Sequence, residues 1–282
     1  MFNFKKSDCY IEQKGEYKMK KSTVNYMVLL SYLILLLFLT NCGGNNSEKE
    51  KLLNSNTMNK TELSGKWISL FDGKTFNGWR GIGIDSIPNG HWEVENGTIH
   101  KIASGNVPTM ADGQPLKGGD LMTDKTFKNF ELSFEWKISE GGNSGVKYNV
   151  SEEVSIKNGS SHALGYEYQV LDDEKHSDNL NPTHRAASLY DLIEAKGKSL
   201  KPVGEFNTAR IVFNNNHLEH WLNGVKVVEA ETDSPEFQEL FKKSKYHKYP
   251  NFTVHKDAHI VLQDHGDDCW YRNIKIKILN NK

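Results

Sequence analysis

The sequence contains little cysteine and no excess of either charge. Only three of its 282 residues are cysteine: Cys9, Cys42 and Cys269. The first two fall in an N-terminal segment interpreted below as targeting sequence, so the remaining chain has no internal disulfide. Its 35 basic and 36 acidic residues give a formal net charge of -1. This balance argues against a nucleic-acid-binding protein and against an acidic solvating tail.

Motifs of several large enzyme classes are also missing. The sequence has no P-loop, dinucleotide fingerprint, zinc-protease helix or nucleophile elbow, and no fixed-period repeat. None of the eleven histidines has metal-ligand spacing with another on one strand, so neither a zinc site nor any cofactor is predicted. The Asp-rich stretches Asp172-Asp173 and Asp264–Asp268 leave a calcium ion open as an alternative, although turns favour Asp for simpler reasons.

The N-terminal segment is predicted to be a targeting sequence. Lys18, Lys20 and Lys21 precede an apolar run from Val24 to Leu39, which is the order of a secretory signal. The run then ends in a segment that resembles a bacterial lipoprotein lipobox, which implies cleavage before Cys42 and lipidation of that cysteine. An uncleaved membrane anchor is the alternative, although the run is short for a span of about 20 residues.

These observations divide the chain into three parts. Residues 1–41 are the expected signal peptide, with Met19 a more natural start than Met1. Residues 42–62 are expected to form a flexible tether from the lipidated Cys42, and residues 63–282 are long enough for one sizeable domain. The lipid implies a membrane partner and a place in the bacterial cell envelope, as a periplasmic or outer-membrane lipoprotein.

Short aromatic segments broken by Gly, Asn and Asp predict an all-β domain. Residues 129–138 alternate apolar and polar side chains, as a strand buried on one face does. Asn96-Gly97 and Asn223-Gly224 predict type I′ hairpins. One helix is expected, from Ser234 as N-cap to about Lys243. About a dozen strands with one short helix favour a jelly-roll β-sandwich, although periodicity does not give the strand order.

Polar residues on one face of successive strands mark a candidate site. These residues come from three expected strands, and in a curved sheet their faces could line one concave surface: Glu135, Lys147, Glu167 and Gln169. Near the C-terminus, Gln263 and His265 leave one face of a strand just before a turn at Gly266, in an expected closing hairpin. Each feature alone is explained as well by a solvated sheet face or a polar turn.

Several short motifs, in their order along the chain, resemble the 3-keto-disaccharide hydrolase domain family, formerly a domain of unknown function. The matching pieces are Leu70–Lys74 with Gly78-Trp79, Phe130–Leu132 through Glu135-Trp136, Gly142–Tyr148, Tyr166–Asp172, Ser188–Leu192, Lys201–Glu205, His220–Lys226, and Leu262–Gly266 with Arg272–Ile274. Each motif is modest alone, and the resemblance depends on their order.

The resemblance implies a concanavalin A-like jelly roll of two antiparallel sheets, in secreted or lipid-anchored proteins that act on oxidised sugars. A ketone at C3 of a glycoside acidifies the C2 proton. Once a base removes that proton, the enolate expels the aglycone from C1, and water adds to the resulting enone. Such a site needs a base, an acid for the leaving group, and a cation or donors for the enolate oxygen.

We therefore predict an enzyme that cleaves 3-keto-glycosides or 3-keto-disaccharides. The predicted catalytic roles are His265 or Glu135 as the base, Glu167 as the other acid–base group, and Lys147 with Arg272 for the oxyanion. The residues predicted to bind sugar hydroxyls are Asn143, Gln169, Arg185, Tyr190, His220, Gln263 and Arg272. Two alternatives stay open: a non-catalytic carbohydrate-binding lectin, and a scaffold in a surface complex.

Overall fold

The computed structural model describes residues 65–104, 119–157, 162–252 and 257–280. All the described residues belong to one compact unit, Asn59–Lys282. The predicted signal peptide (residues 1–41), the whole predicted tether with Cys42 (residues 42–62) and residues 63–64 of the predicted domain lie outside the described residues. In the part that the structure describes, no helix is both long enough and apolar enough to cross a membrane.

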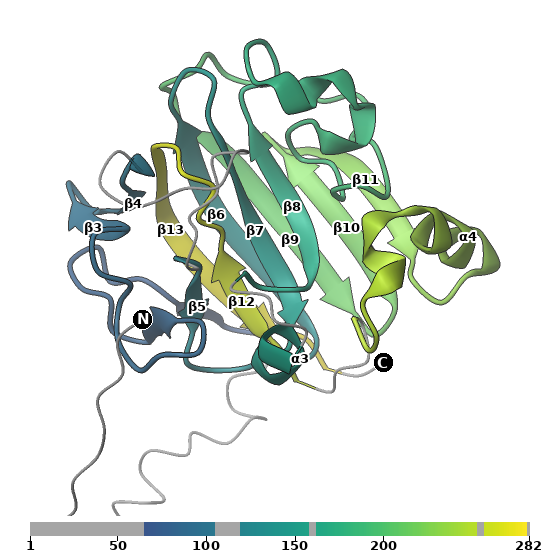
Figure 1. Cartoon of the computed structure of the whole chain (residues 1–282), viewed down its shortest axis with the longest axis horizontal. Helices are drawn as coiled ribbons and strands as arrows, with labels where there is room; N and C mark the ends of the chain where they lie inside the picture. The colour runs from purple at the N-terminus through teal and green to yellow at the C-terminus, as the bar shows by residue number, and fades with distance from the viewer. Residues whose placement is uncertain (1–64, 105–118, 158–161, 253–256, 281–282) are drawn as a thin grey trace, which may run out of the picture. The chain divides into compact units, whose positions relative to one another are not determined.

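Two antiparallel sheets form the described unit (Figure 1). The larger sheet has eight strands in the order β11-β10-β9-β6-β13-β4-β3, with β1 paired to β13. Its strands are β1 (Trp67–Ser69), β3 (Trp92–Glu95), β4 (Thr98–Lys101), β6 (Phe130–Ile138), β9 (Asn207–Asn214), β10 (His217–Leu222), β11 (Val225–Glu231) and β13 (Cys269–Ile278). Both Asn-Gly pairs close hairpins at positive φ, β3–β4 and β10–β11, so the predicted turns are confirmed.

The smaller sheet has five strands in the order β2-β5-β12-β7-β8. Its strands are β2 (Trp79–Gly81), β5 (Leu121–Thr123), β7 (Asn143–Val150), β8 (Tyr166–Leu171) and β12 (His259–Leu262). The chain crosses from one sheet to the other between β6 and β7, and again between β12 and β13. The C-terminal segment expected to be a hairpin is therefore a crossover between the sheets.

Side chains of the two inner faces meet in one aromatic core. Burial alternates residue by residue along β6, as the sequence predicts, and Phe134 packs edge-on against Tyr168 with ring centroids 5.5 Å apart. The rings of Trp136, Tyr148 and Tyr271 are also buried there. Each large apolar side chain contributes about 1.5–3 kcal/mol on burial. The predicted all-β jelly-roll sandwich of two antiparallel sheets is confirmed.

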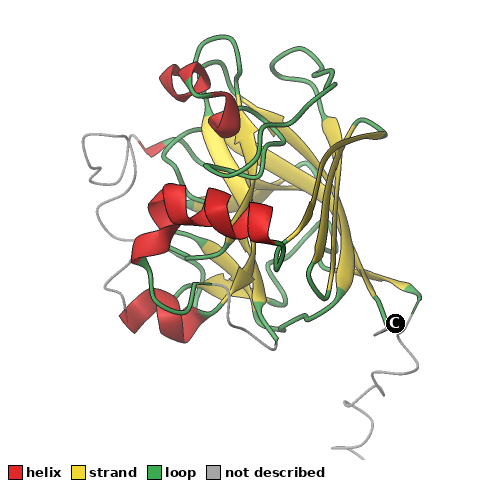
Figure 2. Ribbon diagram, turned by 90° about the vertical axis from the view of Figure 1, so that its right-hand side faces the viewer, coloured by secondary structure: helices red, strands yellow, loops and turns green. Residues whose placement is uncertain are grey.

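The helices gather on the side of the five-stranded sheet (Figure 2). The predicted helix is α4 (Pro235–Lys243), and the side chain of Ser234 caps it by accepting from the backbone N–H of Phe237. The structure adds short elements that the sequence analysis does not predict, because one or two turns carry no clear periodicity: α3 (Glu152–Lys157) and the 3-10 helices η2 (Ser177–Leu180), η3 (Pro182–His184) and η4 (Lys245–Lys248).

Candidate active site

The outer face of the five-stranded sheet carries a strip of polar side chains. The pairing of β7 with β8 places Lys147 opposite Glu167, and Gly145 opposite Gln169. On the other side of β7, the backbone N–H of Gln263 donates to the Gly145 carbonyl (2.8 Å). Residues directly opposite each other share a face of the sheet, so three separate segments deliver these groups to one place.

Gly145 leaves a gap in this strip, and the Glu167 carboxyl occupies it. A Cβ atom at position 145 would lie 2.5 Å from Glu167 Oε1, which is inside van der Waals contact. Glu167 is 3% exposed, and this burial raises the pKa of its carboxyl above the usual value against the opposing effects of Lys147 and Lys245. A buried carboxyl with a raised pKa is a candidate for proton transfer, so Glu167 is the candidate acid–base group of the strip.

Lys147 is held at one end of the strip by buried acceptors. Its Nζ lies 3.6 Å from Asp120 Oδ2 and donates to the Ala163 carbonyl (3.2 Å). Asp120 also accepts from the backbone N–H groups of Ala163 (2.7 Å) and Asp264 (2.9 Å). The ammonium group is thus fixed beside Glu167, where it can stabilise negative charge that develops on a bound oxygen.

Two buried amide oxygens lie on either side of Gly145. Gln169 Oε1 and Gln263 Oε1 have no hydrogen-bond partner among the described residues, although Gln169 Nε2 donates to Asn143 Oδ1 (3.2 Å). A buried polar atom without a partner costs about 1–3 kcal/mol. Hydroxyl groups of a ligand that donate to these two oxygens would recover that free energy, which is consistent with the predicted binding role of both glutamines.

Asn143 lies at the other end of the strip. It is four residues from Lys147 on β7, which is about 13 Å along an extended strand. Its backbone N–H donates to Asp267 Oδ2 (2.9 Å), and its Nδ2 lies 3.4 Å from His265 Nε2. The ring of His176, from the loop after β8, packs edge-on against His265 with centroids 6.1 Å apart. The turn between β12 and β13 and the loop after β8 therefore meet beside the strip.

Two further residues predicted to bind substrate, Tyr190 and Arg185, lie in the loop that follows β8. The backbone N–H of Tyr190 donates to the Glu167 carbonyl (3.0 Å), and its hydroxyl donates to Asp178 Oδ2 (3.1 Å). Arg185 Nε donates to the Asn179 carbonyl (2.9 Å) within the same loop. Tyr190 thus borders the strip, whereas this contact of Arg185 stabilises the loop.

The structure does not bring Glu135 and Arg272 to the strip. They face each other on β6 and β13 of the eight-stranded sheet, where Arg272 Nε donates to Glu135 Oε2 (2.7 Å). The prediction that Glu135 and Lys147 line one surface is wrong, because the chain changes sheets between β6 and β7. Alternation shows which residues share a face of a strand, but not which sheet the strand joins.

His220 is a core residue and does not reach the strip. It is 0% exposed, its Nε2 lies 2.8 Å from the Tyr148 hydroxyl, and its Nδ1 lies 3.0 Å from the Ala187 carbonyl. Burial lowers the pKa of this histidine to about 4. The predicted role of His220 in substrate binding is therefore wrong, because both ring nitrogens are occupied inside the sandwich.

The free energy of unfolding should fall between pH 6.5 and about 4 because of His220. The unfolded chain protonates this ring near 6.5, whereas the folded chain does so only near 4. The unfolded state binds more protons in this window, so the stability present above it is lost as the pH falls. The loss is about 3 kcal/mol at most. Urea unfolding from pH 4 to 7 should show a shallower slope in His220→Gln, and an unchanged slope would contradict this assignment.

The structure adds four groups around the strip that the sequence analysis does not assign to the site: Asp120, His176, Lys245 and Asp267. Lys245 lies in η4, with its Nζ 4.2 Å from the Tyr190 ring centroid. Asp120, His176 and Lys245 come from loops and a short helix whose residues show no periodicity, so no sequence pattern points to them. The Asp-rich stretch Asp264–Asp268 is the sequence signal that points to Asp267.

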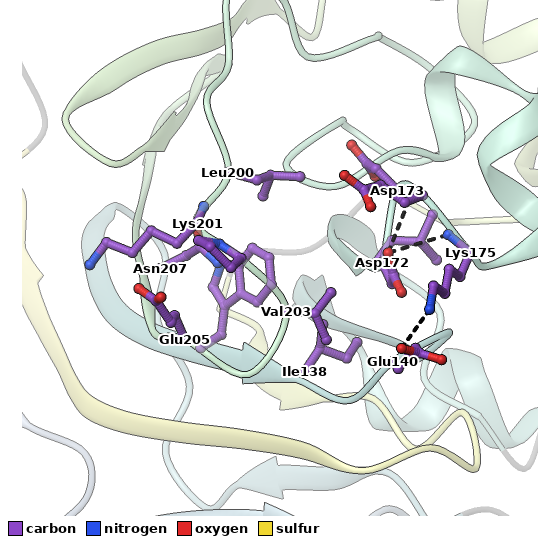
Figure 3. Close-up of a pocket in the computed structure, with 14 residues that line it drawn as sticks. Ile138, Glu140, Asp172, Asp173, Lys175, Leu200, Lys201, Val203, Glu205 and Asn207 are labelled. Atoms are coloured by element: carbon purple, nitrogen blue, oxygen red, sulfur yellow. Dashed lines mark hydrogen bonds and ion pairs between the residues drawn. The ribbon is translucent and has the colours of Figure 1, made fainter.

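A separate hollow of about 400 Å³ opens beside the ends of β6 and β8 (Figure 3). Its wall includes Trp136 and Leu200, and at its rim Lys175 Nζ pairs with Glu140 Oε2 (2.5 Å). The described residues that line it include none of the predicted catalytic residues. The strip on the sheet face is therefore the stronger candidate for acid–base chemistry.

The fold and the strip define a β-sandwich protein with a buried carboxyl of raised pKa and a fixed lysine on one sheet face, together with two buried amide oxygens that have no partner among the described residues. Such a site suits a hydroxyl-rich ligand. The chain belongs to the 3-keto-alpha-glucoside-1,2-lyase-like domain family, which it matches over residues 66–277. The resemblance to the 3-keto-disaccharide hydrolase domain, inferred above from the order of short motifs, is confirmed.

Known relatives agree with this assignment. The chain is 39% identical over 234 residues to a 3-keto-disaccharide hydrolase of Bacteroides thetaiotaomicron, covering 76% of this chain and 79% of the relative. Among solved structures it is similar to a protein described as a glycosyl hydrolase from Parabacteroides distasonis, with a TM-score of 0.66 and 26% identity over 79% of this chain and 98% of that one. A second such protein from the same organism gives a TM-score of 0.54 and 25% identity, over 76% and 100% of the two chains.

Proposed function

We propose that the protein cleaves 3-keto-glycosides, including 3-keto-disaccharides, by C2 proton abstraction, elimination of the aglycone and hydration. Its family and its curated relative support a carbohydrate-cleaving enzyme. The observation that carries the mechanism is the Glu167 carboxyl, which is buried over Gly145, has a raised pKa and lies beside the fixed ammonium group of Lys147.

In the first step, Glu167 takes the proton from C2, and the C–H electron pair forms an enolate with its charge on the C3 oxygen. Lys147 stabilises that oxygen, as a cation beside a developing oxyanion does. The enolate then re-forms the ketone and expels the C1 oxygen with its bonding electrons. This oxygen receives a proton at the Asn143 end of the strip, from His265 or from a bound water.

In the second step, a water molecule adds its hydroxide to C1 of the enone and gives its remaining proton to the group that protonated the leaving oxygen. C2 recovers its proton from Glu167, so the net reaction is hydrolysis. An ordinary glycosidase needs two carboxyl groups about 5–9.5 Å apart. Glu135, the second carboxyl considered, lies on the other sheet and cannot form such a pair with Glu167. Because the ketone acidifies the C2 proton, a single buried carboxyl with a neighbouring cation is sufficient for the elimination.

Turnover tests this proposal. The purified chain incubated with a 3-keto-disaccharide should release free 3-keto-sugar, whereas a lectin would bind the disaccharide without releasing product. Glu135→Gln should keep kcat/KM within about twofold of wild type, since a surface substitution far from the reacting atoms removes no transition-state contact. Absence of product in wild type would refute the proposed activity, and inactivity of a folded Glu135→Gln variant would refute the location of the site.

A further inference from the structure

A cluster of histidine and aspartate side chains stands at the Asn143 end of the strip and is not explained by the acid–base pair. It consists of His176, His265 and Asp267, which are all half-buried, and one ligand atom from each lies within 4.8 Å of the others. We propose that these three residues bind a divalent transition-metal ion. Two imidazoles and one carboxylate are ligands that suit manganese, iron, cobalt or zinc, and they leave coordination positions open.

The surroundings of the cluster support the proposal. Asp267 Oδ2 is fixed by the backbone N–H of Asn143 (2.9 Å), so this carboxylate is oriented before any ligand arrives. Asn143 also connects the cluster to the strip, because its Oδ1 accepts from Gln169 Nε2 (3.2 Å). Outer contacts of this kind orient metal ligands and tune their affinity.

Two buried oxygens next to the cluster are a second, independent sign of a ligand. Gln169 Oε1 and Gln263 Oε1 are without a hydrogen-bond partner among the described residues. Both glutamines flank Gly145, which is two residues from Asn143 on β7. A water or substrate hydroxyl bound to a cation is a strong hydrogen-bond donor. Donation to these oxygens would satisfy two acceptors that the protein itself leaves open.

One existing contact must change when the metal binds. His176 Nδ1 accepts from the backbone N–H of Asp178 (3.1 Å), which places the proton of the neutral ring on Nε2. Coordination through Nε2 moves that proton to Nδ1 and gives up this hydrogen bond. A single neutral hydrogen bond is weak beside metal coordination, so the contact does not prevent binding.

Two other groups of metal-binding residue types occur among the described residues, and both are less suitable. They are Glu93, Glu95 and His100 on β3 and β4, and His217, Glu219 and Glu229 on β10 and β11. In each, the histidine is already bound to carboxylates, with His100 Nδ1 2.9 Å from Glu93 and His217 Nδ1 2.6 Å from Glu231. Both groups also belong to the eight-stranded sheet, away from the strip.

The role of this ion rests on the proposed function. Lys147, Gly145 and Asn143 follow one another along the strip, so a sugar whose C3 oxygen meets Lys147 and whose C2 lies under Glu167 directs C1 toward the cluster. A metal-bound water there gives its proton to the leaving oxygen, and the hydroxide that remains adds to C1. Metal ions lower the pKa of bound water enough for both steps near neutral pH.

Metal binding itself is tested without substrate. The probe is Mn²⁺ alone, titrated into the full chain after treatment with a chelator, with free Mn²⁺ measured by electron paramagnetic resonance. Wild type should bind one ion. His176→Ala and Asp267→Asn should weaken binding by more than the roughly 10- to 100-fold that loss of an outer contact costs. The matched control His217→Ala should bind as wild type does. Thermal unfolding without metal establishes that each variant is folded.

The outcomes separate this inference from the proposed function. Three results would each overturn the metal site: wild type that does not bind Mn²⁺, His176→Ala and Asp267→Asn variants that bind Mn²⁺ as tightly as wild type does, or a His217→Ala variant that no longer binds it. A chain that cleaves a 3-keto-disaccharide after complete metal removal also overturns the ion's role and leaves the proposed function intact. A chain that binds Mn²⁺ through these residues but releases no product keeps the site and refutes the function.

Discussion

Glu167→Gln should lower kcat for a 3-keto-disaccharide about 100- to 10,000-fold, which is the range for loss of a general acid–base group. The amide keeps the size of the carboxyl and fits the same gap over Gly145, but it cannot accept the C2 proton. Since the carboxyl is buried and has a raised pKa, the fold does not depend on its charge. The variant should therefore unfold at nearly the wild-type temperature while losing turnover.

The pH profile gives a second measurement on the same residue. As a base, Glu167 acts in its ionised form, so kcat/KM of wild type should fall as the pH drops through its raised pKa. That acid limb should lie above the ordinary carboxyl range, and it should be missing from the residual activity of Glu167→Gln. A variant that retains both the wild-type rate and the acid limb would remove Glu167 from the mechanism.

Asp264→Ala should destabilise the fold by about 3–5 kcal/mol, because it leaves a buried charge without its partner. Asp264 and Lys101 are both 0% exposed, and Asp264 Oδ1 lies 2.9 Å from Lys101 Nζ. The second oxygen, Oδ2, lies 2.5 Å from His91 Nδ1. Removal of this carboxylate strands the ammonium group of Lys101 inside the sandwich.

Urea denaturation at pH 7 measures this effect as a change in the free energy of unfolding. The control is Glu239→Ala, which removes an exposed ion pair with Lys242 on α4 and should cost no more than about 1 kcal/mol. Equal stability of Asp264→Ala and wild type would show that the buried network contributes nothing to the fold.

Local sequence patterns predict the strands and turns well because these depend on short-range chemistry. The alternation along β6 and the two Asn-Gly hairpins follow from side-chain direction and positive φ, and the structure has all of them. The same two-residue alternation puts the side chains of Lys147, Glu167 and Gln169 on the polar faces of their strands. For these residues, the local sequence is enough to predict which face of the strand each side chain occupies.

Local sequence patterns do not predict which of the two sheets a strand joins. Glu135 has the same alternation as Lys147, yet its strand joins the opposite sheet, and a four-residue turn between them decides this. His220 shows a second limit, since a polar side chain on a strand predicts exposure unless its partners are known. Here those partners, Tyr148 and Ala187, are more than 30 residues away in the sequence. Contacts of that separation have no signal in a single sequence.

The crossover between β12 and β13 makes the candidate active site depend on both sheets at once. β12 belongs to the five-stranded sheet and β13 to the eight-stranded sheet, so the turn with His265 and Asp267 has its final position only when the two sheets are packed together. Asp264, in the same turn, also reaches Lys101 on β4. A chain that has formed only the β7–β8 pair holds Lys147 opposite Glu167 but lacks the other end of the strip. The candidate site is therefore expected to be completed late and cooperatively during folding, because its contacts join segments far apart in the sequence.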